Sequence, residues 1–133
     1  MKTNKVRIAE VAAVIICIII VLVLTVVLQL FTSRTLRRMQ MDINKAVDCF
    51  PDSEVCRIAI DDIADQYKKH KDILLIVYNH ADVSDLEFAI ECALVIQNTA
   101  PHDEARFLIE LKRVRSCIST LIEKEQVSIE HLL

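Results

Sequence analysis

The residues best suited to chemistry gather in one stretch of the chain, YNHADVSDLE at positions 78–87. It holds one imidazole and three carboxylates within eight positions: His80, Asp82, Asp85 and Glu87. Such a set can bind a divalent metal ion or pass protons between an acid and a base. The same residue types also occur where one helix ends and the next begins, so the surrounding elements decide between these readings.

The local pattern favours a corner between two helices. Apolar periodicity breaks over residues 81–86, and within this break Ser84 is followed three residues later by Glu87, the spacing of a capping box. Asp82 is a second candidate cap. His80 lies near the end of the preceding helix, where a positive charge complements the helix dipole. We interpret these four residues as a helix-cap corner, with a metal or acid–base site as the alternative.

The rest of the chain offers little support for catalysis or cofactor binding. None of the four histidines makes a His-x-x-x-His pair, and there is no Cys-x-x-Cys motif, so the usual ligand spacings of zinc are missing. The chain has no glycine, which excludes the glycine-rich phosphate-binding motifs. We predict no catalytic residues, no metal and no cofactor, and therefore no enzyme.

Composition predicts an all-α protein with one membrane-spanning segment. Tight strand turns depend on glycine, so its absence argues against a β or α/β fold. Residues 11–33 carry no charge, and as a helix they extend roughly 35 Å, enough to cross the hydrocarbon core of a bilayer. A cleaved signal peptide is the rival interpretation, but a shorter apolar region and a small-x-small site are expected there.

Charge bears on orientation and on partners. Basic residues flank the predicted span on both sides, whereas from Asp42 onward 18 acidic residues outnumber 10 basic ones. A long domain crosses the membrane largely regardless of charge, so we expect the N terminus inside the cell and the C-terminal domain outside the cytoplasm. Nucleic acid is excluded as a partner, because phosphate binding requires a basic surface.

The remaining residues predict helices joined by short turns. After a tail at 1–10 and the span at 11–33, we expect the domain 34–133 to form an antiparallel helical bundle that continues from the span. Its helices are expected at about 34–50, 53–81, 84–99 and 101–126, with Asp52 or Ser53 and then Thr99 or Ala100 as caps. The second helix has apolar residues at coiled-coil spacing: Cys56, Ile60, Ile63, Tyr67, His70, Leu74, Val77 and Ala81.

The end of that second helix is apolar on all sides. A helix of 28 residues is longer than the water-exposed part of the first helix, so its end is expected near the membrane level. We predict that the segment Ile73, Leu74, Leu75, Ile76 and Val77 is covered on every side, by helices three and four and by lipid or a partner. The segment is therefore a candidate interaction surface.

Two cysteines flank the first turn of the bundle. Cys49 and Cys56 are equally distant from the turn at 51–53, which places them at the same level on facing helices. They can form a disulfide in an oxidising compartment, or they can pack as two small hydrophobic side chains. Cys92 and Cys117 stand at unequal distances from the next turn and are not expected to bond.

Two long runs carry a resemblance to a known family. YKKHKDILLIVYNHADVSDLEFAIECALVIQ and DEARFLIELKRVRSCISTLIEKEQVSIEHLL resemble small single-pass membrane proteins of clostridial and related Gram-positive bacteria, a family classified as a domain of unknown function. The shared pattern includes Tyr67, Asn79-His80, a turn with Val83, Leu86 and Glu87, and the glutamate-rich end. The resemblance implies a membrane-anchored bundle and no activity.

Two functions fit these expectations. The first is a membrane-anchored helical interaction module that binds another membrane or envelope protein, or itself. The second is a ligand-sensing or regulatory input domain, in which a ligand shifts helix packing and the span transmits the change. Since only about ten residues precede the span, any output would have to come from a partner's chain, which favours the first function.

Overall fold

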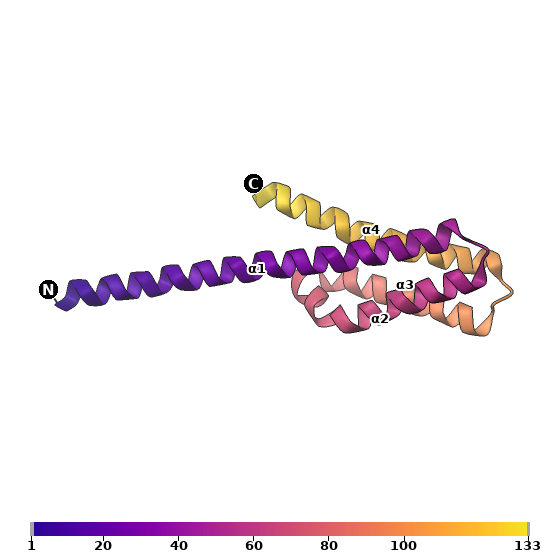
Figure 1. Ribbon diagram of the computed structural model, residues 1–133, viewed down its shortest axis with the longest axis horizontal. Helices are drawn as coiled ribbons and strands as arrows, with labels where there is room; N and C mark the ends of the chain where they lie inside the picture. Colours follow the sequence, from indigo (N-terminus) through magenta and orange to yellow (C-terminus); the bar gives the residue numbers. More distant parts are fainter. Residues whose placement is uncertain (1, 133) are drawn as a thin grey trace. The chain divides into compact units, whose positions relative to one another are not determined.

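The computed structural model describes the backbone of residues 2–132 and the side chains of residues 3–52 and 54–125. Over this backbone the chain forms four helices and no strand (Figure 1), which confirms the predicted all-α fold. The helices are α1 (Lys2–Asp48), α2 (Ser53–Val77), α3 (His80–Thr99) and α4 (Glu104–Leu132).

The chain divides into two compact units, residues 1–31 and residues 32–133. In the first unit every side chain of residues 11–27 is exposed, although nearly all of them are apolar. By length and composition, α1 is a helix that could cross a membrane, and none of its apolar window is buried within the chain. Apolar surface of this extent is costly in water and favourable in lipid.

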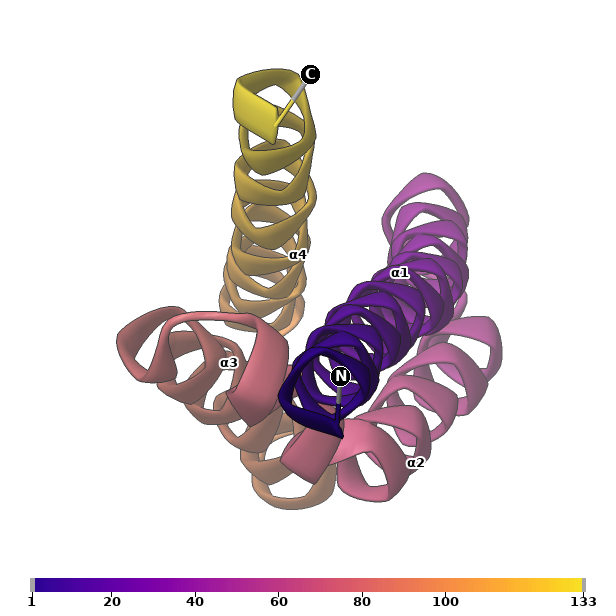
Figure 2. The ribbon, with the colours of Figure 1, turned by 90° about the vertical axis from the view of Figure 1, so that its left-hand side faces the viewer.

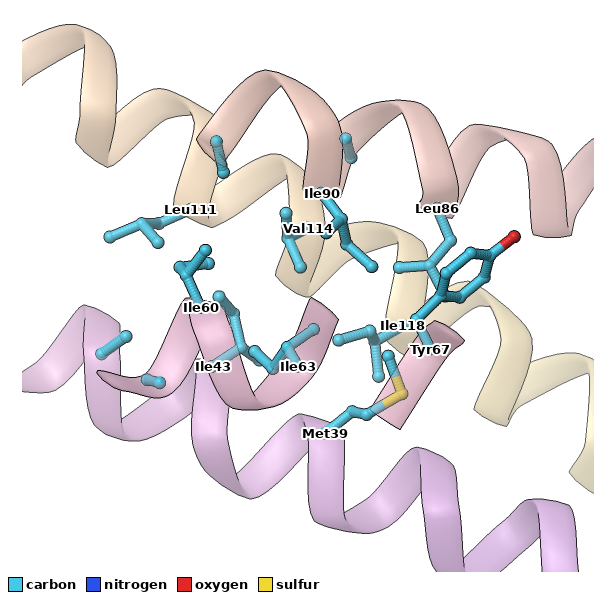
Figure 3. Close-up of a cluster of buried hydrophobic side chains, with 14 of the residues drawn as sticks. Met39, Ile43, Ile60, Ile63, Tyr67, Leu86, Ile90, Leu111, Val114 and Ile118 are labelled. Carbon is cyan, nitrogen blue, oxygen red and sulfur yellow. The ribbon is translucent and has the colours of Figure 1, made fainter. Parts of the chain in front are cut away.

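Residues 32–133 form an antiparallel helical bundle, as predicted (Figures 1 and 2). Each helix gives one stripe of apolar side chains, spaced three or four residues apart, to a shared core. Ten of these side chains are labelled in Figure 3, where they lie among all four helices. The largest fully buried ones are Leu36, Met39, Ile43, Ile60, Ile63, Leu74, Val83, Leu86, Leu111, Val114, Ile118 and Leu121.

Polar contacts fix how the helices face one another. The Cys56 thiol donates to the Ala46 carbonyl at 3.3 Å, which joins α2 to α1 close to their connecting turn. At the other end of the bundle, the Tyr78 hydroxyl donates to Glu125 Oε2 of α4 at 3.1 Å and lies near Thr32 of α1. The α2–α3 turn therefore lies at the bundle end that holds residue 32.

The second helix is shorter than predicted. We expected it to reach residue 81, but α2 ends at Val77 because Tyr78 has an extended backbone, with φ −112° and ψ 164°. Asn79 then caps α3, since its side-chain oxygen accepts the Ala81 N–H at 2.9 Å. The predicted stripe from Cys56 is buried as far as Leu74, apart from the half-buried His70.

The boundaries of the other helices also differ from the predicted ones. The first helix ends at Asp48 rather than residue 50, and Cys49–Pro51 form a turn with a cis Phe50–Pro51 peptide bond. Asp52 caps α2, as one of the two predicted candidates. The fourth helix begins at Glu104, because Asp103 Oδ1 accepts the Arg106 N–H at 3.2 Å. Thr99 and Ala100 instead complete the end of α3.

Candidate functional site

A groove with a volume of about 650 Å³ lies between α2 and α3. Its floor is apolar, since Tyr67 and Ile90 are buried there and Leu94 is half-buried. Its rims carry four carboxylates and two ammonium groups: Asp61, Asp65, Glu87, Glu91, Lys68 and Lys71. We call this the α2–α3 groove. Its lining suits an amphipathic ligand with a cationic part.

A polar network closes one part of this groove. The buried Tyr67 hydroxyl donates to Glu87 Oε2 at 3.1 Å, and Lys71 Nζ donates to Glu87 Oε1, also at 3.1 Å. Burial raises the pKa of Tyr67, and the hydrogen bond to Glu87 raises it further. The phenol therefore remains a protonated donor at neutral pH. Both oxygens of Glu87 are engaged in joining α3 to α2.

The helix-cap corner predicted at His80, Asp82, Ser84 and Glu87 is displaced and its capping box is wrong. The N-cap is Asn79, so Ser84 lies exposed within α3 and Glu87 pairs with α2. His80 begins α3 instead of ending α2. The missed signal is Val83, three residues before Leu86 and fully buried, which requires the helix to start earlier.

These side chains do not converge on one point. Asp82 lies in the first turn of α3 and forms an ion pair with Lys124 of α4. Glu87 is directed to the opposite neighbour, α2. Across the residues that the structure describes, no group of three or more histidine, cysteine, aspartate or glutamate side chains could hold a metal ion.

The residues of the segment 73–77, which was predicted as an interaction surface, lie on different faces of α2. Leu74 is fully buried in the core, so it cannot belong to a surface, whereas Ile76 is 73% exposed. Ile73, Leu75 and Val77 are partly buried. The helix positions Leu74 in the core stripe, which leaves Ile76 on the outer face. Within this chain, Ile76 is therefore the exposed member of the segment, and a lipid or a partner would have to cover it.

The cysteines at the first turn are not bonded to each other. Cys49 is exposed and Cys56 is buried, with its thiol donated to the Ala46 carbonyl. Burial raises the pKa of Cys56, which disfavours the reactive thiolate. The packing interpretation therefore describes Cys56, while Cys49 lies at the surface. Cys92 and Cys117 are also free and half-buried.

A carboxyl pair between α1 and α2 was not predicted from the sequence. Asp42 and Asp62 accept from the same donor, since Gln66 Nε2 donates to Asp42 Oδ2 at 3.1 Å and to Asp62 Oδ2 at 2.7 Å. Burial and the neighbouring Asp62 raise the pKa of Asp42 to about 6, whereas the interaction with Asp42 lowers the pKa of Asp62. The spacing of Asp62 and Gln66 places both on one helix face, which was the available signal.

Comparisons of the chain with protein-family models, with curated proteins and with solved structures found no match.

Proposed function

We propose that the protein is a membrane-anchored helical interaction module of the cell envelope. In this proposal residues 11–33 lie in the bilayer, the N terminus is inside, and the bundle stands outside the cytoplasm. The bundle binds another membrane or envelope protein, or a second copy of itself. Membership of the Gram-positive membrane family that the sequence resembles is part of the same proposal.

The observation that carries the proposal is the apolar surface left over once the core is complete. Four helices fill the core, yet several large apolar side chains of the bundle remain more than half exposed. On α3 and α4 these are Phe88, Val95 and Ile109, with exposed fractions of 61%, 57% and 58%. Apolar side chains that a bundle does not use for folding are typical of protein contacts.

The anchor is supported by the exposed apolar part of α1. A helix with this surface would aggregate in water, whereas a bilayer satisfies its side chains and the helix satisfies its own backbone. The bundle is acidic, with 18 acidic against 10 basic residues from Asp42 onward, and this net charge disfavours nucleic acid as a partner.

Protease protection tests the orientation. Protease added to intact cells stripped of their wall is expected to digest residues 34–133. Opening the membrane should then be needed only for digestion of the short N-terminal tail. A bundle that stays intact until the membrane is opened would contradict the extracytoplasmic location.

Co-purification after cross-linking in native membranes tests the interaction. The full-length protein is expected to bring down one defined protein in stoichiometric amount. A matched variant, Phe88→Glu, should lose that protein while keeping its membrane location and helical content. Recovery of the protein alone, in monomeric form, would count against an interaction module.

A ligand-sensing domain is the second candidate, and the α2–α3 groove favours it. The groove holds about 650 Å³ and joins an apolar floor to the Tyr67–Glu87–Lys71 network. A ligand bound there would change the contact between α2 and α3. A small molecule that co-purifies with the protein and is lost in Tyr67→Ala would support this candidate over the first.

A further inference from the structure

The outer face of α3 carries a short apolar seam. Phe88, Cys92 and Val95 follow one another at spacings of four and three residues, and Thr99 continues the row. These positions lie away from the buried stripe of α3, which is Val83, Leu86, Ala89, Ile90, Ala93 and Ile96. Alternating four- and three-residue spacing is the pattern by which two helices pack along a common line. We call these four residues the α3 seam.

A hollow of about 240 Å³ lies on this seam. Its α3 wall includes Phe88, Glu91, Cys92 and Val95, at positions i, i+3, i+4 and i+7, and Arg106 of α4 is part of the opposite wall. Four residues at this spacing form the hole that receives a side chain from a facing helix in knobs-into-holes packing. The residue that a parallel identical helix presents at this level is its own Cys92.

The two sides of the seam carry opposite charges. Glu91 lies on the side of α2, since it also lines the α2–α3 groove. Arg106 lies on the side of α4, together with Glu110, whose carboxylate is already paired with Arg113 at 3.4 Å. A two-fold axis along the helix direction reverses these sides, so that Glu91 of one copy faces Arg106 of the other. An antiparallel pair would instead place acidic side against acidic side and basic against basic.

We propose that the α3 seam binds the α3 seam of a second copy of this chain, with the two helices parallel. The inference rests on the proposed function, because the span would hold the copies of the chain in one membrane, where they can meet. Confinement to the membrane also raises the effective concentration of the copies, so a short seam is sufficient for pairing.

Cysteine cross-linking in isolated membranes tests the contact. The variant to be cross-linked has the substitutions Cys17→Ala, Cys49→Ala and Cys117→Ala, so that its remaining cysteines are Cys92 and the buried Cys56. Mild oxidation should convert most of the protein to a disulfide-linked dimer through Cys92. The control adds Cys92→Ala and should stay monomeric, because Cys56 is only 1% exposed and cannot reach another chain.

The parallel direction is tested with Thr99→Cys in that control background. In a parallel pair the two copies of residue 99 face each other. In an antiparallel pair centred on Cys92 they are separated by 14 residues of helix, or about 21 Å, which no disulfide spans. Cross-linking at both 92 and 99 supports the proposal, while cross-linking at 92 alone overturns it in favour of an antiparallel pair.

Two substitutions test the chemistry of the seam. Phe88→Glu should lower the dimer yield of the Cys92 protein at least tenfold, whereas Ile58→Glu, at an equally exposed site on α2, should leave it unchanged. Glu91→Arg should weaken the dimer, and adding Arg106→Glu should restore it. Equal loss in the Phe88 and Ile58 variants, or no rescue, would overturn the proposed contact.

The failures of the two proposals are distinguishable. Absence of the Cys92 dimer in membranes overturns pairing through α3, and co-purification of a different protein would still support an interaction module. A chain that is recovered outside the membrane fraction overturns the anchored module, whatever cross-links it forms.

Discussion

The carboxyl groups of Asp42 on α1 and Asp62 on α2 share one donor, because Gln66 Nε2 donates to Asp42 Oδ2 at 3.1 Å and to Asp62 Oδ2 at 2.7 Å. Two carboxyl groups held this close favour sharing one proton over carrying two charges. Asp42 is the partner that takes up the proton as pH falls, because its burial raises its pKa to about 6 while the pKa of Asp62 is lowered. Folding of the bundle is therefore linked to the protonation of Asp42.

This linkage predicts a loss of stability as pH rises. The pKa of Asp42 is raised on folding from 3.8 to about 6, so its contribution is complete below about pH 4 and disappears as pH passes 6. Asp42→Asn keeps a donor to Asp62 and an acceptor for Gln66 without a titrating proton. At pH 7.5 we expect Asp42→Asn to increase the free energy of unfolding by about 1 kcal/mol, which corresponds to a rise of about 4–8 °C in Tm. This free energy is smaller than the full pKa shift would give, because Asp42 is partly solvated.

Thermal unfolding of the full-length protein in detergent between pH 4.5 and 7.5 measures this effect. The Tm difference between Asp42→Asn and the parent should grow with pH across that range. Asp65→Asn, at an exposed position of α2, is the control and should show no such growth. A constant difference would mean that Asp42 does not carry the proton.

The start of α3 gives a prediction with an internal control. Asn79→Ala removes the acceptor for the Ala81 N–H and should cost about 1 kcal/mol of unfolding free energy. Ser84→Ala removes a hydroxyl from the exposed middle of α3 and should be neutral or slightly stabilising. Urea titration followed by circular dichroism separates the two. A larger loss of stability for Ser84→Ala than for Asn79→Ala would instead support the capping box at residues 84–87.

The apolar end of α2 is tested by two neighbouring substitutions. Leu74→Ala should destabilise the bundle by about 2–5 kcal/mol, because Leu74 is fully buried. Ile76→Ala should change stability by less than about 0.5 kcal/mol in detergent, because Ile76 is 73% exposed.

Labelling in membranes shows whether anything covers that position. In a background without reactive cysteines, Ile76→Cys is expected to react with a water-soluble maleimide more slowly in native membranes than in detergent. Asp72→Cys, at an exposed position of the same helix, should react equally fast in both. Fast labelling of position 76 in membranes would show that it faces open water, contrary to the predicted coverage by lipid or a partner.

The Tyr67–Glu87–Lys71 network predicts unequal contributions from its members. Tyr67→Phe removes a buried hydroxyl that donates at 3.1 Å and should cost about 1 kcal/mol. Lys71→Gln removes a partly exposed ion pair and should cost less than about 0.5 kcal/mol. Equilibrium unfolding of each variant provides the comparison, and a larger loss for Lys71→Gln would mean that the ion pair dominates.

Local pattern was sufficient for much of the fold. The three- and four-residue spacing from Cys56 to Leu74 identified the buried face of α2, and Asp52 was recognised as a candidate cap. Both features depend on residues that lie within one or two helical turns of each other. Boundaries were less certain, because Asn79 and Ser84 are both good caps. The burial of Val83 against other helices decided between them.

The amino-acid sequence by itself determined that this chain is helical, that residues 11–33 form an uncharged apolar stretch, and which side of most helices is apolar. These properties follow from composition and from the 3.6-residue period of one helix. The tertiary structure decided that Glu87 pairs with Tyr67 and that Asp42 meets Asp62. These pairs join different helices, and their contact depends on how far one helix is shifted and rotated against the next, which no single helix encodes.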